Sequence, residues 1–319
     1  MATGREHIPV LLREVIGALA PHDGGTYIDA TFGRGGYARG LLMAANLSVI
    51  GIDRDPEAIR AGQKIAIDFR PRLTLLQGPF GAMDVLLAGE HIDQVDGIAL
   101  DLGVSSPQLD DPARGFSFRA DGPLDMRMSQ SGPSAADIVN AMPERELADV
   151  IFEYGEERHS RKVAARIIEA RKEKRIARTL ELAEIVRGAV PRSADGIDPA
   201  TRTFQALRIY VNDEINELKR GLAAAELLLK PKGRLAVVSF HSLEDRTVKE
   251  FLRHRSATVA SVSRHLPAND RGFAPSFHLI TRKPITASAE DVHDNPRARS
   301  AKLRVAERTD APAIRENAA

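Results

Sequence analysis

The chain contains no cysteine and no tryptophan, and aromatic residues make up only 5% of its 319 residues. Without cysteine it can form neither a disulfide nor a thiolate metal site, and this composition suits the reducing cytoplasm. No stretch approaches the roughly 20 consecutive apolar residues that a membrane-spanning helix needs. Charged residues also stand in the N-terminal segment where a secretory signal would be apolar. We therefore expect a cytoplasmic globular protein with no membrane partner and no bound metal.

The charges are unevenly distributed, although the net charge is only +1. Residues 1–150 carry 13 Lys and Arg against 21 Asp and Glu, whereas residues 151–244 carry 18 against 14 and residues 245–308 carry 13 against 7. A basic region beside an acidic one is a hint of nucleic-acid contact. A chance distribution of solvated surface charge explains the same numbers, so the charge pattern alone leaves both interpretations open.

The first third of the chain alternates short apolar segments with helical ones. Strands are predicted at residues 25–32 (GTYIDATF), 47–55 (LSVIGIDRD), 72–80 (RLTLLQGPF) and 95–103 (VDGIALDLG). The segment between the second and third begins with Pro56, which suits the first turn of a helix because proline lacks an N–H. Strands joined through helices by short links predict an α/β fold with a parallel sheet covered on both faces.

From about Pro107 to Asn212 the strand pattern disappears. A loop rich in Gly, Asp and Arg is followed by stretches whose apolar residues recur near a period of 3.6, which predicts helices. The strand pattern returns at GRLAVVSFHS, and FAPSFHLITRKPI is expected to add two edge strands. We therefore predict four parts: a core, an all-helical insert, the rest of the core with a basic C-terminal segment, and a disordered tail, at residues 1–106, 107–212, 213–308 and 309–319.

The turn after the first predicted strand, IDATFGRGGYARGLL, has the form of a nucleotide-binding loop. Gly33, Gly35 and Gly36 let the chain take positive φ and let a ligand approach the backbone, where the next helix offers free N–H groups. A dinucleotide fingerprint would need a third spaced glycine, but Ala38 stands there, and no P-loop Lys follows. The alternative interpretation is a plain tight turn.

Two further strand ends point to an adenosine-containing ligand. Asp53 ends the second predicted strand, 18 residues after Gly35, where a carboxylate commonly accepts hydrogen bonds from ribose hydroxyls. Phe80 follows the third strand and is placed to pack against an adenine ring. A water-facing cap for Asp53 and an ordinary core position for Phe80 are the alternatives. These features do not separate NAD from S-adenosylmethionine.

The fourth strand ends at Asp101, and Ser105 and Ser106 follow in a tight polar loop. Methyl transfer asks the protein mainly to orient the acceptor and to exclude water, and a carboxylate suits a cationic cofactor. Hydrogen-bond acceptors beside Asp101 would localise the lone pair of an exocyclic amine, so these three residues are the catalytic candidates. His241, at the end of the strand in GRLAVVSFHS, is a fourth, although a structural histidine is at least as consistent with its position.

Taken together, these runs resemble the RsmH (MraW) family of ribosomal RNA small-subunit methyltransferases. The matching segments extend from His7 to Arg308 and include HIPVLLREV, YIDATFGRGGYARGLL, IGIDRDPEAI, YGEER, TRTFQALRIYVNDEI, GRLAVVSFHSLEDRTVKEFLR and NPRARSAKLRVAER. The most specific is DGIALDLGVSSPQLDDPARGFSFRADGPLDMRM.

The resemblance implies a class I (Rossmann-like) S-adenosylmethionine-dependent methyltransferase core with an all-helical inserted domain. It implies methylation of the exocyclic N4 of a cytidine in the decoding region of 16S rRNA, near the P site, within the small ribosomal subunit. Carried over by motif, the implied cofactor contacts are Gly33, Gly35, Gly36, Tyr37, Asp53, Phe80, Asp101 and Gln108. One position departs from the family, which usually has His where this chain has Tyr37.

An RNA substrate needs basic contacts to its phosphates, and a base inside a structured RNA must be turned out to react. The C-terminal run NPRARSAKLRVAER supplies Arg297, Arg299, Lys302 and Arg304, which we predict to bind RNA. The helix ERHSRKVAARIIEARKEKR supplies more cations, for which a solvated helix face is the alternative.

Three other functions compete with this prediction. An NAD-dependent oxidoreductase is disfavoured by the glycine spacing. A non-catalytic RNA-binding assembly factor would keep the pocket and the basic surface without the reaction. A methyltransferase acting on DNA or protein would keep the cofactor and change the acceptor.

Overall fold

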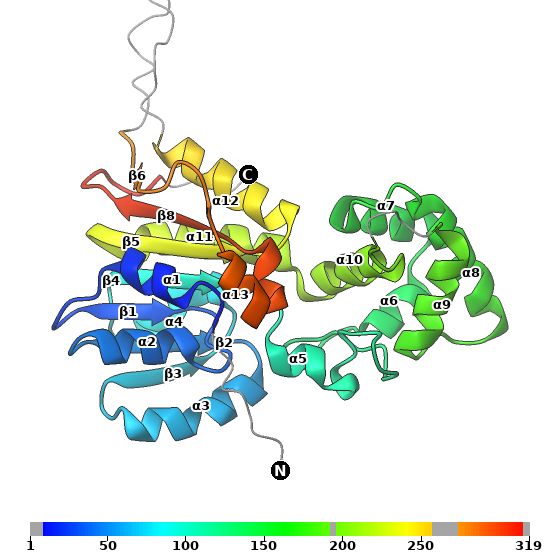
Figure 1. Ribbon diagram of the computed structural model, residues 1–319, viewed down its shortest axis with the longest axis horizontal. Helices are drawn as coiled ribbons and strands as arrows, with labels where there is room; N and C mark the ends of the chain where they lie inside the picture. Colours follow the sequence, from blue (N-terminus) through cyan, green and yellow to red (C-terminus); the bar gives the residue numbers. More distant parts are fainter. Residues whose placement is uncertain (1–8, 192–195, 257–273, 315–319) are drawn as a thin grey trace, which may run out of the picture. The chain divides into compact units, whose positions relative to one another are not determined.

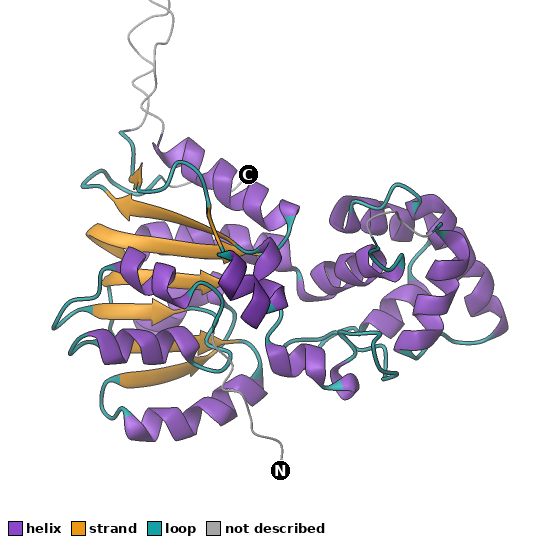
Figure 2. Ribbon diagram, viewed as in Figure 1, coloured by secondary structure: helices purple, strands orange, loops and turns teal. Residues whose placement is uncertain are grey.

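The computed structural model describes residues 9–191, 196–256 and 274–314. The chain divides into two compact units, one made of residues 1–103 and 216–319 and the other of residues 104–215. The first unit combines a sheet with helices, whereas the second is built of helices and loops, as the colours of Figure 2 show.

In the described part of the chain, one sheet forms the centre of the first unit (Figure 1). Its strands are β1 (Thr26–Asp29), β2 (Ser48–Asp53), β3 (Leu73–Gln77), β4 (Val95–Asp101), β5 (Leu229–Ser239), β6 (Phe277–Leu279), β7 (Ile285–Thr286) and β8 (Lys302–Arg308). The order is β3-β2-β1-β4-β5-β8-β6, with β7 also paired to β8. Strands β1 to β5 are parallel, and β8 is antiparallel to β5, β6 and β7. The α/β class expected from the sequence is confirmed.

The strands read as nearly continuous apolar runs because both faces of the sheet are buried. Side chains of a strand alternate between the two faces, so Ile98 and Leu100 of β4 enter one hydrophobic cluster while Ala99 enters the other. Strand β5 divides in the same way, with Leu235 on one side and Ala236 on the other. The central strands therefore have no solvent-exposed face.

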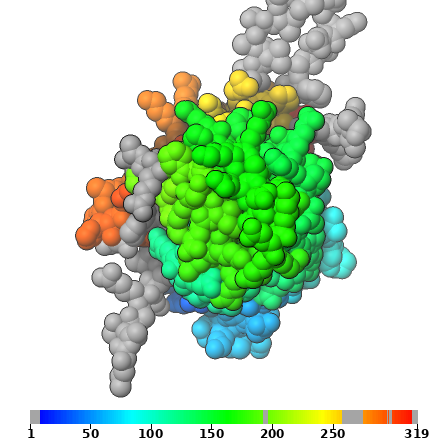
Figure 3. All heavy atoms as spheres, turned by 90° about the vertical axis from the view of Figure 1, so that its right-hand side faces the viewer, coloured from blue at the N-terminus to red at the C-terminus, as the bar shows by residue number. Residues whose placement is uncertain are grey.

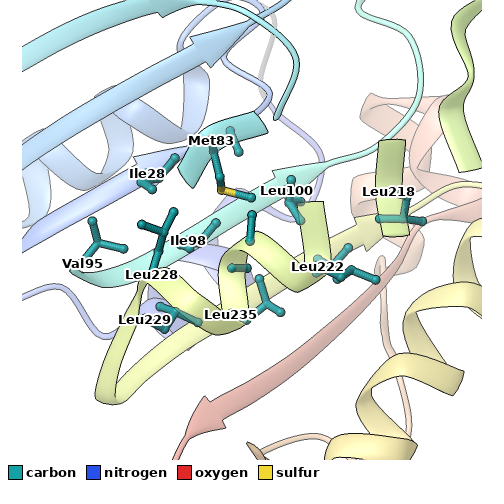
Figure 4. Close-up of a cluster of buried hydrophobic side chains, with 14 of the residues drawn as sticks. Ile28, Met83, Val95, Ile98, Leu100, Leu218, Leu222, Leu228, Leu229 and Leu235 are labelled. Carbon is teal, nitrogen blue, oxygen red and sulfur yellow. The ribbon is translucent and has the colours of Figure 1, made fainter. Parts of the chain in front are cut away.

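Helices cover both faces of the sheet. One face packs against α4 (Met83–Gly89), α11 (Glu214–Leu228) and α12 (Ser242–Ser256). Figure 4 shows this cluster, with Met83, Leu218 and Leu222 placed over Ile98 and Leu100. The other face packs against α1 (Leu12–Leu19), α2 (Gly36–Ala44), α3 (Pro56–Asp68), α13 (Ala289–Asp294) and the 3-10 helix η3 (Pro296–Ser300). This double covering leaves the strand ends as the place for a ligand.

The second unit has its own hydrophobic core. Its helices are α5 (Ser106–Asp110), η2 (Pro112–Arg114), α6 (Ala135–Ala141), α7 (Glu144–Gly155), α8 (Ser160–Glu173), α9 (Thr179–Ala189) and α10 (Ala200–Asn212). The long loop before α6 is held by Asn212, whose side chain accepts from the Met128 N–H and donates to the Met126 carbonyl. Among the described residues no helix is long and apolar enough to cross a membrane.

The C-terminal segment after β8 corrects a prediction. Buried Arg308 donates to the carbonyls of Ser276 (2.9 Å) and Ala311 (2.7 Å), and the Ile314 N–H donates to the buried Glu226 carboxylate (3.0 Å). The predicted disorder is therefore wrong for residues 309–314, because buried Arg308 and Glu226 need hydrogen-bond partners that this segment supplies. Residues 315–319 lie outside the described residues.

Replacing Arg308 with Ala is expected to lower the free energy of unfolding by about 2–4 kcal/mol, because several buried carbonyls lose their donor. Urea unfolding followed by circular dichroism measures the change. Arg299→Ala is the matched control, since Arg299 is exposed, and we expect it to change stability by less than about 0.5 kcal/mol. Equal unfolding midpoints for the two variants would contradict the structural role of Arg308.

Candidate active site

Three carboxylic acids end three strands at the same edge of the sheet. Asp29 ends β1, Asp53 ends β2 and Asp101 ends β4. Strand β1 pairs in parallel with both β2 and β4, and Asp29 lies opposite Gly51 and Ala99. The carboxyl ends of parallel strands meet at one edge, which is where ligands bind in doubly wound sheets.

The glycine-rich turn follows β1 and depends on the absence of side chains. Gly33 and Gly35 have positive φ values of 51° and 72°. A Cβ atom on Gly35 would lie 2.7 Å from the Phe32 ring, and one on Gly36 would overlap Pro9. The turn is braced from β2, because Asp53 Oδ2 accepts a hydrogen bond from the Gly33 N–H at 2.8 Å.

Helix α2 begins directly at this turn, with Gly35 as its N-cap. Asp29 Oδ2 accepts from the Ala38 N–H at 3.0 Å, so one carboxylate oxygen satisfies part of the first helical turn. The N–H groups of Gly36 and Tyr37 precede it in the same turn and have no intrahelical acceptor. They carry the positive end of the helix dipole, which favours a carboxylate or another anionic group of a ligand.

The side chain of Tyr37 does not take part in this anion-binding turn. Its ring is buried, and its hydroxyl donates to the carbonyl of Val10 at 2.6 Å. Burial raises the pKa of Tyr37 well above its ordinary value, with the carboxylates of Asp101 and Asp29 adding to the effect. The side chain therefore anchors the segment before α1, and only the main chain of Tyr37 is placed to meet a ligand at the turn.

Two of the three acids have an oxygen with no partner. Oδ1 of Asp29 and Oδ1 of Asp101 are buried and accept no hydrogen bond from the described residues. A buried polar atom without a partner is rare in proteins and marks a place where a donor is missing. Both atoms belong to acids at the carboxyl edge of the sheet, beside the glycine turn.

Burial raises the pKa of all three carboxyls. It raises the pKa of Asp29 to about 7 and that of Asp53 to about 6, although amide hydrogen bonds oppose the shift. The pKa of Asp101 is raised well above its ordinary value by burial and by the nearby Asp29 and Glu244 carboxylates. A cation bound here would favour the ionised forms, so the site is suited to a positively charged ligand that also donates hydrogen bonds.

The backbone around Asp101 is held in place locally. Its N–H donates to Thr31 Oγ1 at 2.7 Å, which ties the end of β4 to the turn after β1. Gly103 follows with φ 95°. The sequence did not single out Thr31 or Asp29 as site residues. The sequence did contain a signal for Asp29, since it is an acid near the carboxyl end of a predicted strand, as Asp53 and Asp101 are.

The predicted serines and Gln108 belong to the second unit. Gln108 is buried, and its Oε1 accepts from the Ser105 N–H at 3.0 Å, which caps helix α5. Ser106 is the first residue of that helix. Their participation in the site stays a prediction.

The ring of Phe80 packs against α11. It begins the 3-10 helix η1 (Phe80–Ala82), it is half-buried, and a Cβ atom on Gly221 would overlap it. Phe80 also packs against the hydrophobic cluster on that face of the sheet. The core interpretation thus accounts for one side of the ring, and a contact with adenine stays a prediction for the rest.

His241 caps a helix. Its Nε2 lies 3.0 Å from Glu244 Oε1, and Glu244 Oε2 accepts from the N–H of Phe240 at 2.7 Å. Glu244 stands in the first turn of α12, so the pair closes the start of that helix. This geometry is consistent with the structural alternative for His241. Its Nε2 is nevertheless buried without a well-aligned hydrogen bond to the described residues, so a catalytic role stays a prediction.

Two of the predicted RNA-binding residues in the basic C-terminal segment form ion pairs within the protein. Arg304 lies in β8 with its side chain only 11% exposed, and its Nε donates to Asp245 at 2.7 Å. Lys302 Nζ lies 3.3 Å from the same carboxylate. Burial acts to raise the pKa of Asp245, but the hydrogen bond and charge of Arg304 and the charge of Lys302 bring it below its ordinary value.

The ion pair with the half-buried Asp245 carboxylate gives no support to an RNA contact of Arg304, which stays a prediction. Lys302 shares that carboxylate. Arg299 is exposed in η3, and the side chain of Arg297 lies outside the described residues.

A family model described as the MraW methylase family matches residues 4–309. The chain belongs to this family. The resemblance seen in the sequence is thus confirmed, and the α/β sheet is the core of an MraW methylase.

The chain is similar to several named proteins over nearly its whole length. Ribosomal RNA small subunit methyltransferase H of Rhodospirillum centenum (strain ATCC 51521 / SW) is 63% identical over 309 residues, covering 97% of this chain and 94% of the relative. The protein of the same name from Paramagnetospirillum magneticum (strain ATCC 700264 / AMB-1) is 61% identical, covering 96% and 97%. A solved structure, a putative rRNA-methylase from Clostridium thermocellum, is 15% identical with a TM-score of 0.44, covering 95% of this chain and 98% of that one.

Asp29→Asn tests the raised carboxyl pKa. A folded-state pKa of about 7 against an unfolded value of 3.8 means that the native state holds this proton more tightly. The wild type should therefore lose stability as pH rises from about 4 to 7, by up to about 4 kcal/mol. The variant should show a flatter profile and a higher melting temperature at pH 8. Parallel profiles, measured by thermal unfolding at five pH values, would refute the raised pKa.

Proposed function

We propose that this MraW methylase transfers the methyl group of S-adenosylmethionine to the exocyclic N4 of a cytidine in the decoding region of 16S rRNA, within the small ribosomal subunit in the cytoplasm. The observation that carries the proposal is the pair of unpartnered buried carboxylate oxygens, on Asp29 and Asp101, beside a glycine turn. Family membership and relatives named for small-subunit rRNA support the acceptor.

The residues present suit this cofactor. The Oδ1 atoms of Asp29 and Asp101 would accept from its α-ammonium group, and the amide groups at the start of α2 would suit its carboxylate. Asp53 would accept from the ribose hydroxyls while it braces Gly33. Because Gly35 and Gly36 lack side chains, Phe32 and Pro9 can pack directly against the turn, which holds its amide groups in place for a ligand.

When bound, the cofactor supplies a methyl group on a sulfonium, a strong electrophile. That methyl group would pass to the acceptor N4, and the electron pair of the broken carbon–sulfur bond would stay on sulfur. The proton that N4 then loses passes to water. The protein contributes orientation and exclusion of water, and Ser105 and Ser106 are the proposed acceptors of hydrogen bonds from the amine. No metal is required for these steps.

The deciding experiment incubates small subunits that lack the mark with labelled S-adenosylmethionine, followed by mass mapping of the modified nucleotide. Label on a cytidine N4 of 16S rRNA supports the proposal. Label in protein or DNA would mean that the acceptor is not the rRNA. Absence of label would favour a non-catalytic assembly factor. Binding of NAD without S-adenosylmethionine, measured by calorimetry, would favour an oxidoreductase.

Asp101→Asn should weaken S-adenosylmethionine binding at least tenfold, which corresponds to about 1.4 kcal/mol, because the cationic cofactor loses a carboxylate partner. The matched control is Asp96→Asn at the opposite end of β4, where Asp96 pairs with Lys230 at 2.9 Å. We expect the control to bind the cofactor as the wild type does. Titration calorimetry compares the three proteins, and equal losses in both variants would contradict the assignment.

Cofactor affinity should rise as pH increases from about 5.5 to 7.5. In the free protein the pKa values of Asp53 and Asp29 are raised to about 6 and about 7, and a bound cation favours the ionised forms. Binding below pH 7 must therefore release protons. Calorimetry in two buffers of different ionisation enthalpy counts these protons, and a pH-independent affinity with no proton release would overturn this expectation.

A further inference from the structure

Four cations at the start of α8 have no partner in the part of the chain that the structure describes. Arg158, Arg161, Lys162 and Arg166 are all exposed. Arg158 stands just before the helix, and the other three lie in its first two turns. None of the four makes a hydrogen bond or an ion pair to the described residues. We call these four residues the α8 stripe.

Several other cations of the second unit are neutralised by carboxylates. Lys172 lies 3.0 Å from Glu169, and Arg175 lies 2.7 Å from Asp137. Further pairs are Lys174 with Glu181, Arg178 with Asp121, Arg187 with Asp198, and Arg208 with Glu214. The charge of the α8 stripe is therefore uncompensated locally, whereas the C-terminal half of the same helix is paired.

The stripe occupies one side of the helix. Lys162 and Arg166 are four residues apart within the helix and therefore lie on one face, Arg161 flanks them, and Arg158 stands just before the helix. Lys162 and Arg166 are about 6 Å apart along the axis at 1.5 Å per residue. The rotation of the helix is fixed from the other side, where Val163, Ala164 and Ile167 are buried in the core of the unit. In Figure 3, α8 belongs to the green surface of the second unit.

We propose that the α8 stripe binds the phosphate backbone of the RNA substrate, an inference that rests on the proposed function. Exposed, unpaired Lys and Arg displace counterions from nucleic acid, which gives affinity without sequence preference. Their position at the N-terminal end of α8 adds the positive end of the helix dipole. Arg304 is paired with Asp245, whereas the cations of the stripe have no carboxylate partner among the described residues.

The test variant is Arg158→Gln/Lys162→Gln/Arg166→Gln, and the matched control is Lys172→Gln/Lys174→Gln/Arg175→Gln. Both remove three exposed positive charges from the same unit, but only the control cations are paired. Binding to purified 16S rRNA and to small subunits lacking the mark is measured by filter binding at four salt concentrations. Cofactor affinity and melting temperature are measured for each protein.

The test variant should bind 16S rRNA at least tenfold more weakly at 0.1 M salt. Its slope of log affinity against log salt should be smaller by about 2, which is three contacts at about 0.7 each. The control should keep the wild-type slope, and both should keep wild-type cofactor affinity.

Equal RNA affinities and slopes in the two variants would overturn the inference, even if the wild type methylates the rRNA. If the test variant loses binding to small subunits but not to purified 16S rRNA, the stripe contacts a ribosomal protein and the inference is also wrong. If the test variant loses RNA binding although the wild type transfers no methyl group, the stripe stands and the proposed function fails.

Discussion

The site depends on burying carboxylates at the ends of adjacent parallel strands. Desolvation makes such groups costly, and the structure offsets part of that cost with amide hydrogen bonds. Asp53 holds the Gly33 N–H and Asp29 holds the Ala38 N–H. Each acid therefore shapes the glycine turn or the helix after it. Among the described residues, one oxygen on Asp29 and one on Asp101 keep no partner, and these atoms would suit a cationic hydrogen-bond donor.

The glycine turn and the first helix satisfy a second condition. Gly35 and Gly36 cannot be replaced by larger residues, because Phe32 and Pro9 fill the space that a Cβ atom would take. The ring of Tyr37 turns inward to Val10, so its side chain packs the N-terminal segment and leaves the main-chain amides at the turn in place. Packing and ligand contact are thus divided between the side chain and the backbone of one residue.

Tertiary structure also sorts the basic residues. From the sequence, the C-terminal run is predicted to bind RNA, and the helix at residues 157–175 is a further source of positive charge with a solvated face as its alternative. In the fold, Lys302 and Arg304 meet Asp245 from β8, and Arg308 is buried among carbonyls. The cations of the α8 stripe meet no carboxylate in the part of the chain that the structure describes. Whether a cation can bind a polyanion is decided by its neighbours in space.

The sequence by itself determined the α/β class, the family and the strand ends that carry Asp53 and Asp101, because apolar periodicity, turn residues and long motifs are local properties of the chain. It indicated the glycine turn for the same reason. Only the tertiary structure decided that Asp29 joins the site, that His241 caps a helix, that Arg304 is neutralised and that residues 309–314 are ordered. These outcomes depend on burial and on partners far away in the sequence, such as Glu226 for Ile314. A linear pattern contains no record of such partners, since they meet only when the sheet has formed.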